Sequence, residues 1–326
     1  MIRYIIKRLI MIIPMLIGVT IFLFFLLAMT PGDPAEIALG GSSTPEQMEL
    51  FRQQHGLDRP LPIQYLNYMK GVVLRGDLGT SLFTRQPVTT MIAERVGVTL
   101  FLSLTSLALT IVIALFLGIA MAIKQNSFFD NFMRVATVVL TSMPQFWMAL
   151  MLMLLFTVKL GWLPSTGLTS MKHIIMPLIC LTLGPITLCA RTGRASMLEV
   201  INQDYVRTAR AKGLKRNYII RKHALKNSLL PMVTIYGRMM GNCFAGAVVI
   251  EMIFSINGIG QMMLDALRSK DIPAMMGSVI ISACVIILTN LMTDLVYAFI
   301  DPWIKSQFVR RKFKPVEGKA EVSPVE

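Results

Sequence analysis

Two charged residues stand inside long apolar runs of this 326-residue chain, and they are the first candidates for chemistry. Arg238 lies near the middle of the run Leu229–Ile250, and Asp294 lies toward the end of the run Ala274–Ile300. A charge inside a membrane is costly, so it usually faces a cavity or pairs with a partner. Two interpretations of Arg238 stay open: it lines a passage and meets a ligand carboxylate, or it pairs structurally with a neighbouring subunit. For Asp294 we favour structural pairing over ligand contact.

Arg238 has polar residues farther along the same run. Asn242 and Glu251 follow it by one and by about three helical turns, and they are further candidates for the lining of a passage. A guanidinium in that lining would favour ligands that carry a carboxylate and would repel a bare divalent cation. Gly237 and Gly241 have the small-residue spacing at which two helices approach closely, and we assign them to packing.

The residue types of enzyme and metal sites do not gather in the sequence. His55, His173 and His223 belong to different segments, and the four cysteines form no C-x-x-C pair, so the spacing predicts neither a metal site nor a disulfide framework. No G-x-x-x-x-G-K-[ST] loop occurs, which leaves the chain without a recognisable phosphate cradle. No Ser/His/Asp or Cys/His arrangement is visible either. We therefore predict no catalytic residue, no metal site and no cofactor bound by this chain.

Apolar helices must position these residues, because the composition excludes a soluble domain. The chain is 54% hydrophobic and 15% charged, with a mean hydropathy of +0.63, whereas soluble domains have about 25% charged residues. A membrane-spanning helix needs about 20 apolar residues. Six runs meet or approach that length: Leu9–Met29, Val98–Ile123, Val135–Val158, Ile174–Ala190, Leu229–Ile250 and Ala274–Ile300. The first run is too long for a signal peptide and no A-x-A site follows it, so we predict a retained helix.

The formal charge of +14 predicts which ends of these spans face the cytoplasm. With the N-terminus inside, the inner segments carry 21 Lys/Arg against 7 acids, and the outer segments carry 10 against 10. The whole basic excess then lies on one side of the membrane, as the positive-inside rule expects. We therefore predict an N-in, C-in multi-pass protein whose basic character reflects its topology and not a nucleic-acid partner.

The segment 30–97 is too long to be a simple connection between two spans. Thr44 and Gln47 have the spacing of a capping box, and Gly56 is placed to end the helix that they start. Two more short helices are predicted: Pro62–Met69 and Pro87–Arg95. Two interpretations stay open: the segment is a packing cap over the spans, or it is a platform for an external partner or a wall of the passage.

The segment 191–228 holds ten basic residues and two acids, arranged as helix, glycine and helix. Asp204 is the expected N-cap of a short helix Tyr205–Lys212, and Gly213 is its expected left-handed terminator. A second helix is expected over Lys215–Lys226. Setting the topology and touching anionic lipid would explain the charge, but it would not explain capped helices between two spans. The pattern predicts a docking surface for another protein.

Several motifs follow one another along the chain in a specific order. The inner segment contains Tyr205-Val-Arg-Thr-Ala-Arg-Ala-Lys-Gly213 and then Arg221-Lys-His-Ala-Leu-Lys-Asn-Ser-Leu-Leu-Pro231. The other motifs are Thr30-Pro-Gly-Asp-Pro34, His55-Gly-Leu-Asp-Arg-Pro-Leu-Pro62, Gly76-Asp-Leu-Gly-Thr-Ser81, Trp162-Leu-Pro164 with Gly167, Phe254 to Gly260, and Asp294 to Pro302. In this order over six spans, they resemble the permease subunits of ABC importers, and more narrowly the dipeptide, oligopeptide and nickel branch.

One part of the inner segment departs from the general importer motif, which is Glu-Ala-Ala, three residues, Gly, nine residues, Ile-x-Leu-Pro. Aligned on Gly213, the chain has Arg207-Thr208-Ala209 in place of Glu-Ala-Ala. It has His223-Ala-Leu-Lys226 in place of Ile-x-Leu-Pro. This departure is itself typical of the peptide branch.

The resemblance implies a type I ABC importer permease fold, which is an all-α membrane protein of six transmembrane helices. The implied organisation is 1–29 for the N-terminal tail and first span, 30–97 for an extracytoplasmic helical insertion, 98–300 for a five-helix core with the coupling loop 191–228, and 301–326 for a basic cytoplasmic tail. The residues implied to couple to an ATPase are Tyr205, Arg207, Thr208, Ala209, Arg210, Lys212 and Gly213. Among these, Gly213 would let the chain reverse, and Ala209 would permit close approach.

The resemblance also implies partners and a function. The expected partners are a second homologous permease in a heterodimer, two ABC ATPases that use ATP and Mg, an extracytoplasmic binding protein, and the lipid bilayer of the bacterial cytoplasmic (inner) membrane. The expected function is ATP-driven import of peptides or of peptide-like or metal-chelate ligands such as a nickel metallophore. The alternatives are a stand-alone secondary transporter, for which we see no internal repeats, and an intramembrane enzyme, for which the spans offer no nucleophile–base pair.

Overall fold

The computed structural model describes residues 2–40 and 43–300. Within these ranges it describes side chains from Ile10 to Thr293 except those of Asn217, His223, Leu230, Thr234 and Arg238. The predicted basic tail 301–326 lies outside the described residues. Over the described ranges the chain is helical, and its one β interaction is an isolated bridge between Thr80 and Pro87.

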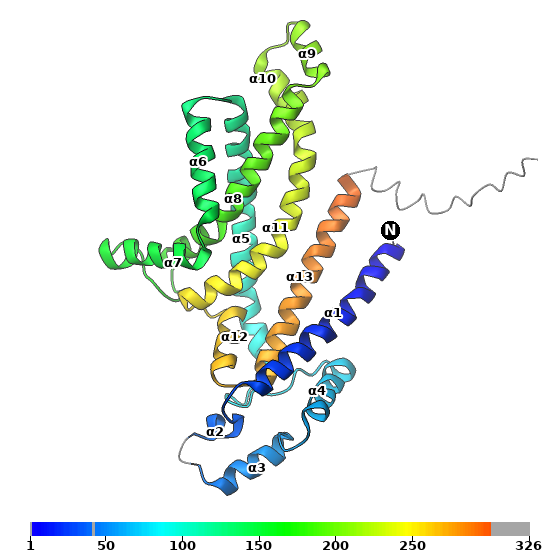
Figure 1. The fold of residues 1–326 in the computed structure, drawn as a ribbon, viewed down its shortest axis with the longest axis vertical. Coiled ribbons are helices and arrows are strands. Elements are labelled where there is room, and N and C mark those ends of the chain that lie inside the picture. Colours follow the sequence, from blue (N-terminus) through cyan, green and yellow to red (C-terminus); the bar gives the residue numbers. More distant parts are fainter. Residues whose placement is uncertain (1, 41–42, 301–326) are drawn as a thin grey trace, which may run out of the picture.

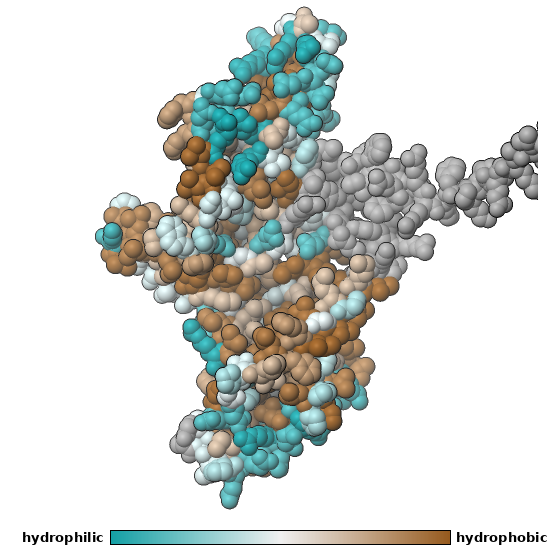
Figure 2. Space-filling view, in the orientation of Figure 1, coloured by the Kyte–Doolittle hydropathy of each residue, from teal (hydrophilic) through white to brown (hydrophobic). Residues whose placement is uncertain are grey.

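Five helices are long and apolar enough to cross a membrane. They are α1 (Ile2–Met29), α5 (Val88–Ile123), α8 (Met171–Ile201), α11 (Leu225–Phe254) and α13 (Ile272–Ile300). Figure 1 shows them running along an elongated molecule, and Figure 2 shows an apolar band between two polar ends. An all-helical membrane protein is therefore confirmed, with the sixth span depending on a bent pair of helices.

The predicted third span, Val135–Val158, is not one straight helix. It is divided between α6 (Phe128–Ser142) and α7 (Gln145–Leu152), which continues as the π-helical segment η1 (Met153–Lys159), and the two parts are bent by 101°. Pro144 explains the break, because proline lacks an N–H and disfavours helical geometry in the residue before it. Met143 is accordingly extended.

The central helices are held together by close backbone approach. A Cβ on Gly118 of α5 would lie 2.8 Å from the carbonyl oxygen of Ala190 in α8. Gly237 and Gly241 of α11 lie against Thr293 and Asn290 of α13, where a Cβ would collide with the facing side chains. These two glycines therefore serve close helix packing, as predicted. Figure 1 also shows α1 beside α13, and the two helices are in contact.

The segment 30–97, which we call the outer cap, forms three short helices that pack against the ends of the spans. They are α2 (Pro34–Leu39), α3 (Pro45–His55) and α4 (Leu61–Arg75). The capping box of Thr44 and Gln47 is confirmed, and Gly56 ends α3 in the left-handed conformation. The helix expected over Pro87–Arg95 is instead the first part of α5, which begins at Val88 because Pro87 sets its start.

The turn before α13 anchors this outer segment. The Lys270 Nζ donates to the carbonyl oxygens of Thr30, at 2.6 Å, and Gly32, at 2.9 Å. Asp271, which is 2% exposed, accepts hydrogen bonds from the Ser81 hydroxyl and, at 3.3 Å, from the Leu82 N–H. These contacts favour the interpretation of the segment as a packing cap.

Candidate functional site

The predicted docking helix is present at the end of the molecule opposite the outer cap (Figure 1). It is α9, Asp204–Ala211, and it follows α8, which extends to Ile201 and so passes well beyond the predicted end at Ala190. The N-cap is Gln203 and not Asp204, which occupies the first helical turn. An acid there remains favourable because it faces the positive end of the helix dipole.

The inner face of α9 is apolar and seated on the next element. Val206 is fully buried and Ala209 is 7% exposed, and both pack against Ile219, which is 3% exposed. Ile219 begins the π-helical segment η2 (Ile219–Ala224) after the short α10 (Arg216–Tyr218). The small side chain of Ala209 therefore permits close packing inside this chain.

The outer face of α9 presents the other predicted coupling residues to solvent. They are Tyr205, Arg207, Thr208, Arg210, Lys212 and Gly213, all of them exposed. The Arg207 side chain is 82% exposed, and its guanidinium lies 3.9 Å from the carboxylate of Asp204. The structure thus brings these six residues together on one solvent-facing surface, which we call the docking face.

Gly213 ends this surface with the predicted backbone reversal. Its φ is +78°, and no atom lies within 4 Å of the position that a Cβ would take. The Gly213 N–H donates to the Arg210 carbonyl oxygen at 2.9 Å. The left-handed conformation, and not a lack of space, is therefore the reason that glycine is favoured here.

The second predicted helix, Lys215–Lys226, is not a separate element. α10 and η2 lead without interruption into α11, and Pro231 lies inside that helix. One hydrogen bond braces α9 against this long helix: the Asn227 Nδ2 donates to the Tyr205 hydroxyl at 2.7 Å. Nothing in the local sequence pattern pointed to Asn227, because the bond joins residues 22 positions apart.

A buried ion pair near the same end of the molecule was also missed. The Arg194 guanidinium in α8 donates to both carboxylate oxygens of Asp130 in α6, at 2.7 and 2.8 Å. Asp130 is fully buried and also accepts the Asn126 N–H at 3.0 Å. The one signal in the sequence was that Asp130 is the only acid between residues 124 and 134. This pair clamps α6 to α8.

The residues predicted to line a passage, Arg238, Asn242 and Glu251, are distributed along α11. Arg238 lies one turn before Asn242, and its side chain is outside those described, as is that of Asp294 in α13. Asn242 is exposed near the middle of the candidate span Pro231–Phe254. Glu251 is fully buried: one carboxylate oxygen accepts the Gly260 N–H at 2.7 Å, and the carboxylate packs against Gly258. Glu251 therefore caps the start of α12 (Ile259–Arg268).

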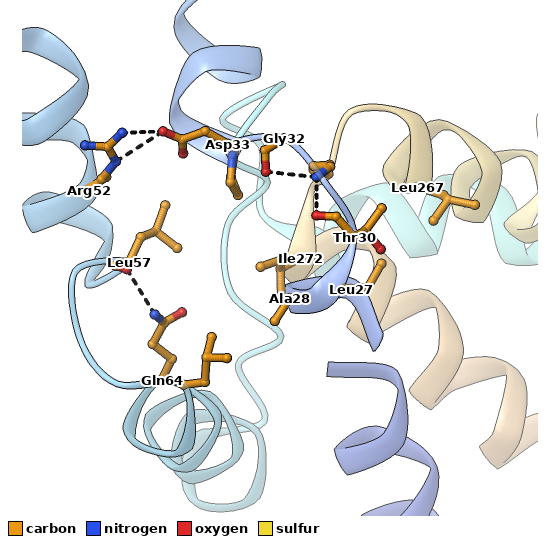
Figure 3. A pocket seen from close by; sticks show the side chains of 13 residues that line it. Leu27, Ala28, Thr30, Gly32, Asp33, Arg52, Leu57, Gln64, Leu267 and Ile272 are labelled. Atoms are coloured by element: carbon orange, nitrogen blue, oxygen red, sulfur yellow. Dashed lines mark hydrogen bonds and ion pairs between the residues drawn. The ribbon is translucent and has the colours of Figure 1, made fainter. Parts of the chain in front are cut away.

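A cavity of about 160 Å³ lies between the outer cap and the spans (Figure 3). Its polar groups are already paired: the Arg52 guanidinium donates to the Asp33 carboxylate, and Lys270 is held by backbone carbonyls. Burial raises the pKa of Asp33, but the hydrogen bonds from Arg52 and Ala35 and the positive charges of Arg52 and Lys270 bring it below its ordinary value. The cavity therefore lies where the outer cap is tied to the spans, and it offers no free polar group to a ligand.

Metal binding finds no support in this geometry. Among the described residues no group of three His, Cys, Asp or Glu side chains is placed to hold an ion. Cys180, Cys189 and Cys243 are buried, and all four cysteines are unpaired.

The chain matches two families of transport proteins. Residues 114–306 match the binding-protein-dependent transport system inner membrane component, and residues 1–105 match the N-terminal region of that component. Similar relatives include a putative peptide permease protein of Brucella suis, which is 40% identical over 318 residues covering 94% of this chain and 99% of the relative. The dipeptide transport system permease protein of Alkalihalophilus pseudofirmus is 38% identical, covering 94% and 100%. The glutathione transport system permease protein of Salmonella typhimurium is 37% identical, covering 94% and 99%.

Solved structures show the same fold at low sequence identity. An inward-facing form of the MetNI methionine ABC transporter superposes with a TM-score of 0.56 and 18% identity, covering 65% of this chain and 97% of that chain. An amino acid ABC transporter determined with histidines gives 0.52 and 12%, covering 66% and 94%. The match over most of the chain, together with the helical architecture, shows that the chain belongs to the binding-protein-dependent transport system inner membrane component family and is a permease subunit of an ABC importer in the inner membrane.

Proposed function

We propose that this permease imports peptides, as one half of a heterodimeric passage formed with a second homologous permease. Two ABC ATPases, which bind the ATP and Mg, dock on the inner side, and an external binding protein delivers the ligand. The ATPase docking proposal rests on the docking face of α9. This face is basic and exposed, and the helix beneath it is held in place by the buried Val206 and Ala209. The relatives named for peptides, dipeptides and glutathione support the ligand class.

The proposed orientation places both ends of the chain in the cytoplasm. It is supported by the charge asymmetry of 21 inner against 10 outer Lys/Arg. α9 then lies on the cytoplasmic side, where ATP is available, and the outer cap lies on the side of the binding protein. Closure of the ATPase pair would move α9, and the continuous helix from η2 into α11 would carry that motion into the spans.

The ligand proposal is that a carboxylate-bearing peptide passes along the face of α11 that carries Arg238 and Asn242. These residues are one helical turn apart, and the face is exposed at Asn242, Ala245 and Val249. Such an exposed stripe within an apolar band suits a contact with a second permease or with the passage between the two. Glu251 has its carboxylate engaged with Gly260, so we propose for it a structural role in place of a passage role.

The test is transport by the complete complex in proteoliposomes. We expect ATP-dependent uptake of a labelled dipeptide that requires the binding protein and both ATPases, and several-fold less uptake with Arg238→Gln at matched expression and ATPase activity. Arg238→Lys is the matched control, because it keeps the charge. Unchanged uptake with Arg238→Gln would remove Arg238 from the passage. Preferred uptake of a nickel chelate over the dipeptide would assign the chain to metallophores, and uptake without ATPases would indicate a secondary transporter.

A further inference from the structure

The helix α4 of the outer cap is apolar on two opposite faces. One face packs inside the molecule, where Tyr65, Tyr68 and Met69 lie against Phe24 of α1 and Met276 of α13. The other face carries four large apolar side chains that are 45% to 72% exposed: Ile63, Leu66, Val73 and Leu74. A helix that is apolar all round is normally buried on all sides. Something outside the described residues therefore covers this second face.

The neighbouring helix α3 shows how a water-facing helix of the same cap is composed. Its exposed residues are mainly polar, among them Glu46, Glu49 and Gln53, and Leu50 is the one large apolar side chain of α3 that is exposed. Both helices belong to the segment 30–97, but only α4 presents an apolar face to its surroundings. The surroundings of α4 are therefore less polar than those of α3.

The inner contacts of α4 lie at the depth of the membrane spans. Figure 1 shows α4 beside the outer part of α1, and the two helices are in contact. The Tyr65 hydroxyl is hydrogen-bonded at 3.0 Å to the hydroxyl of Thr20, which is 1% exposed. Thr20 precedes the outer end of the candidate span Ile10–Met29 by about 13 Å, at 1.5 Å per residue. The hydrocarbon core is about 30 Å thick, so α4 lies alongside the outer half of this span and not above it.

We propose that α4 lies within the membrane, in the leaflet on the side of the outer cap, and that the acyl chains of this leaflet cover its exposed apolar face. The helix packs on two spans at this depth, and its remaining face then meets lipid. The bilayer becomes a second anchor of the outer cap, in addition to the hydrogen bonds that Lys270 donates to Thr30 and Gly32.

Lys70 favours lipid over a second protein as the cover of this face. It is exposed between Leu66 and Val73, at the spacing of four and three residues that places all three side chains on one side of the helix. A packed protein contact would bury the Lys70 ammonium and would need an acid from the partner to pair with it. In the membrane its long stem stays among the acyl chains while the ammonium reaches the headgroup phosphates.

The experiment measures which surroundings the α4 face meets and not transport, so its outcome is independent of the proposed ligand and of ATPase docking. The assembled importer carries a nitroxide spin label at Leu66→Cys, in nanodiscs of phosphatidylglycerol and phosphatidylethanolamine. Collisions of the label are measured with oxygen, which concentrates in lipid, and with chromium oxalate, which stays in water. Leu50→Cys in α3 is the matched control, because Leu50 is 57% exposed and Leu66 is 63% exposed. Both variants replace an exposed leucine, so both are expected to fold.

We expect the ratio of oxygen collisions to chromium oxalate collisions to be several-fold higher at Leu66→Cys than at Leu50→Cys. Val73→Cys, about two turns farther along the same face, should agree with Leu66→Cys. Collisions with chromium oxalate at either α4 position that are as frequent as at Leu50→Cys would place the face in water and overturn the proposal. Few collisions with either reagent would mean that a protein surface, such as the second permease, covers α4, and would overturn it as well.

Discussion

At the scale of single residues, Gly213 is the position where the sequence pattern and the backbone agree most directly. Its φ of +78° is strained for any side chain, although no neighbour would meet one. Valine there costs about 1–2 kcal/mol or more by forcing a β-branched residue into the left-handed region. We predict that Gly213→Val inserts normally in the membrane but loses most of the ligand-stimulated ATPase activity of the complex.

The control for this prediction is Gly161→Val. Gly161 has a φ of +63° and also has no atom within 4 Å of its Cβ position, but it follows η1 and lies far from α9 in the sequence. Both variants force a valine into the left-handed conformation, and they differ only in where along the chain this strain lies. Stimulated ATPase rates that fall equally in both variants would show a general loss of stability and would refute a coupling role for Gly213.

A second prediction at this scale concerns the ion pair of Asp33 and Arg52 in the outer cap. Because the pKa of Asp33 is lowered in the folded protein, the pair contributes stability above the unfolded value of 3.8, and this contribution is lost as the pH falls through the lowered folded pKa. The difference in thermal stability between wild type and Asp33→Asn should therefore be constant near neutral pH, begin to fall below about pH 4, and vanish once the pH is below the lowered folded pKa. Since both side chains are partly exposed, we expect a difference of at most about 1 kcal/mol. A difference that grows on acidification would contradict the assignment.

At the scale of elements, the contact between α5 and α8 depends on one glycine. A methyl group at Gly118 would lie 2.8 Å from the Ala190 carbonyl oxygen and 3.2 Å from the Arg194 amide nitrogen, both of them backbone atoms that cannot rotate away. We predict that Gly118→Ala lowers the free energy of unfolding by about 1–3 kcal/mol, the usual cost of overpacking. Thermal or denaturant unfolding in detergent measures this loss.

Gly97→Ala in the same helix is the matched control. No atom lies within 4 Å of its Cβ position, and alanine is the better helix former by about 1 kcal/mol, so this variant should be neutral or stabilised. Equal stability of Gly118→Ala and Gly97→Ala would contradict the prediction. It would mean that α5 and α8 can move apart to accommodate the methyl group, and so do not form a rigid centre of the permease.

At the scale of the whole molecule, the central prediction is that both ends of the chain face the cytoplasm. Gln53 in α3 and Lys215 beside α10 are exposed at opposite ends of the molecule. A membrane-impermeant maleimide should label Gln53→Cys in intact cells and Lys215→Cys only in inverted vesicles. The native cysteines give little background because three are buried and Cys284 is half-buried. The reverse pattern of labelling would overturn the orientation.

The sequence by itself determined the features that depend on neighbouring residues or on composition. Five of the apolar runs predicted the five helices that are long enough to cross a membrane. The capping box predicted the start of α3, and Gly213 predicted a reversal after α9. Motif order also predicted the family, because the motifs extend over nearly the whole chain. Each of these signals is local, since helix formation and termination depend on residues a few positions apart.

Only the tertiary structure decided which polar residues serve the fold. We propose a structural role for Glu251 because α12 folds back to place the Gly260 N–H against one of its carboxylate oxygens, and Asp130 pairs with Arg194, 64 positions away. Ala209 likewise turned out to face Ile219 inside the chain. Sequence spacing cannot give such pairings, because a buried charge or a small side chain has a role only through the partner that the fold brings within a few ångströms of it.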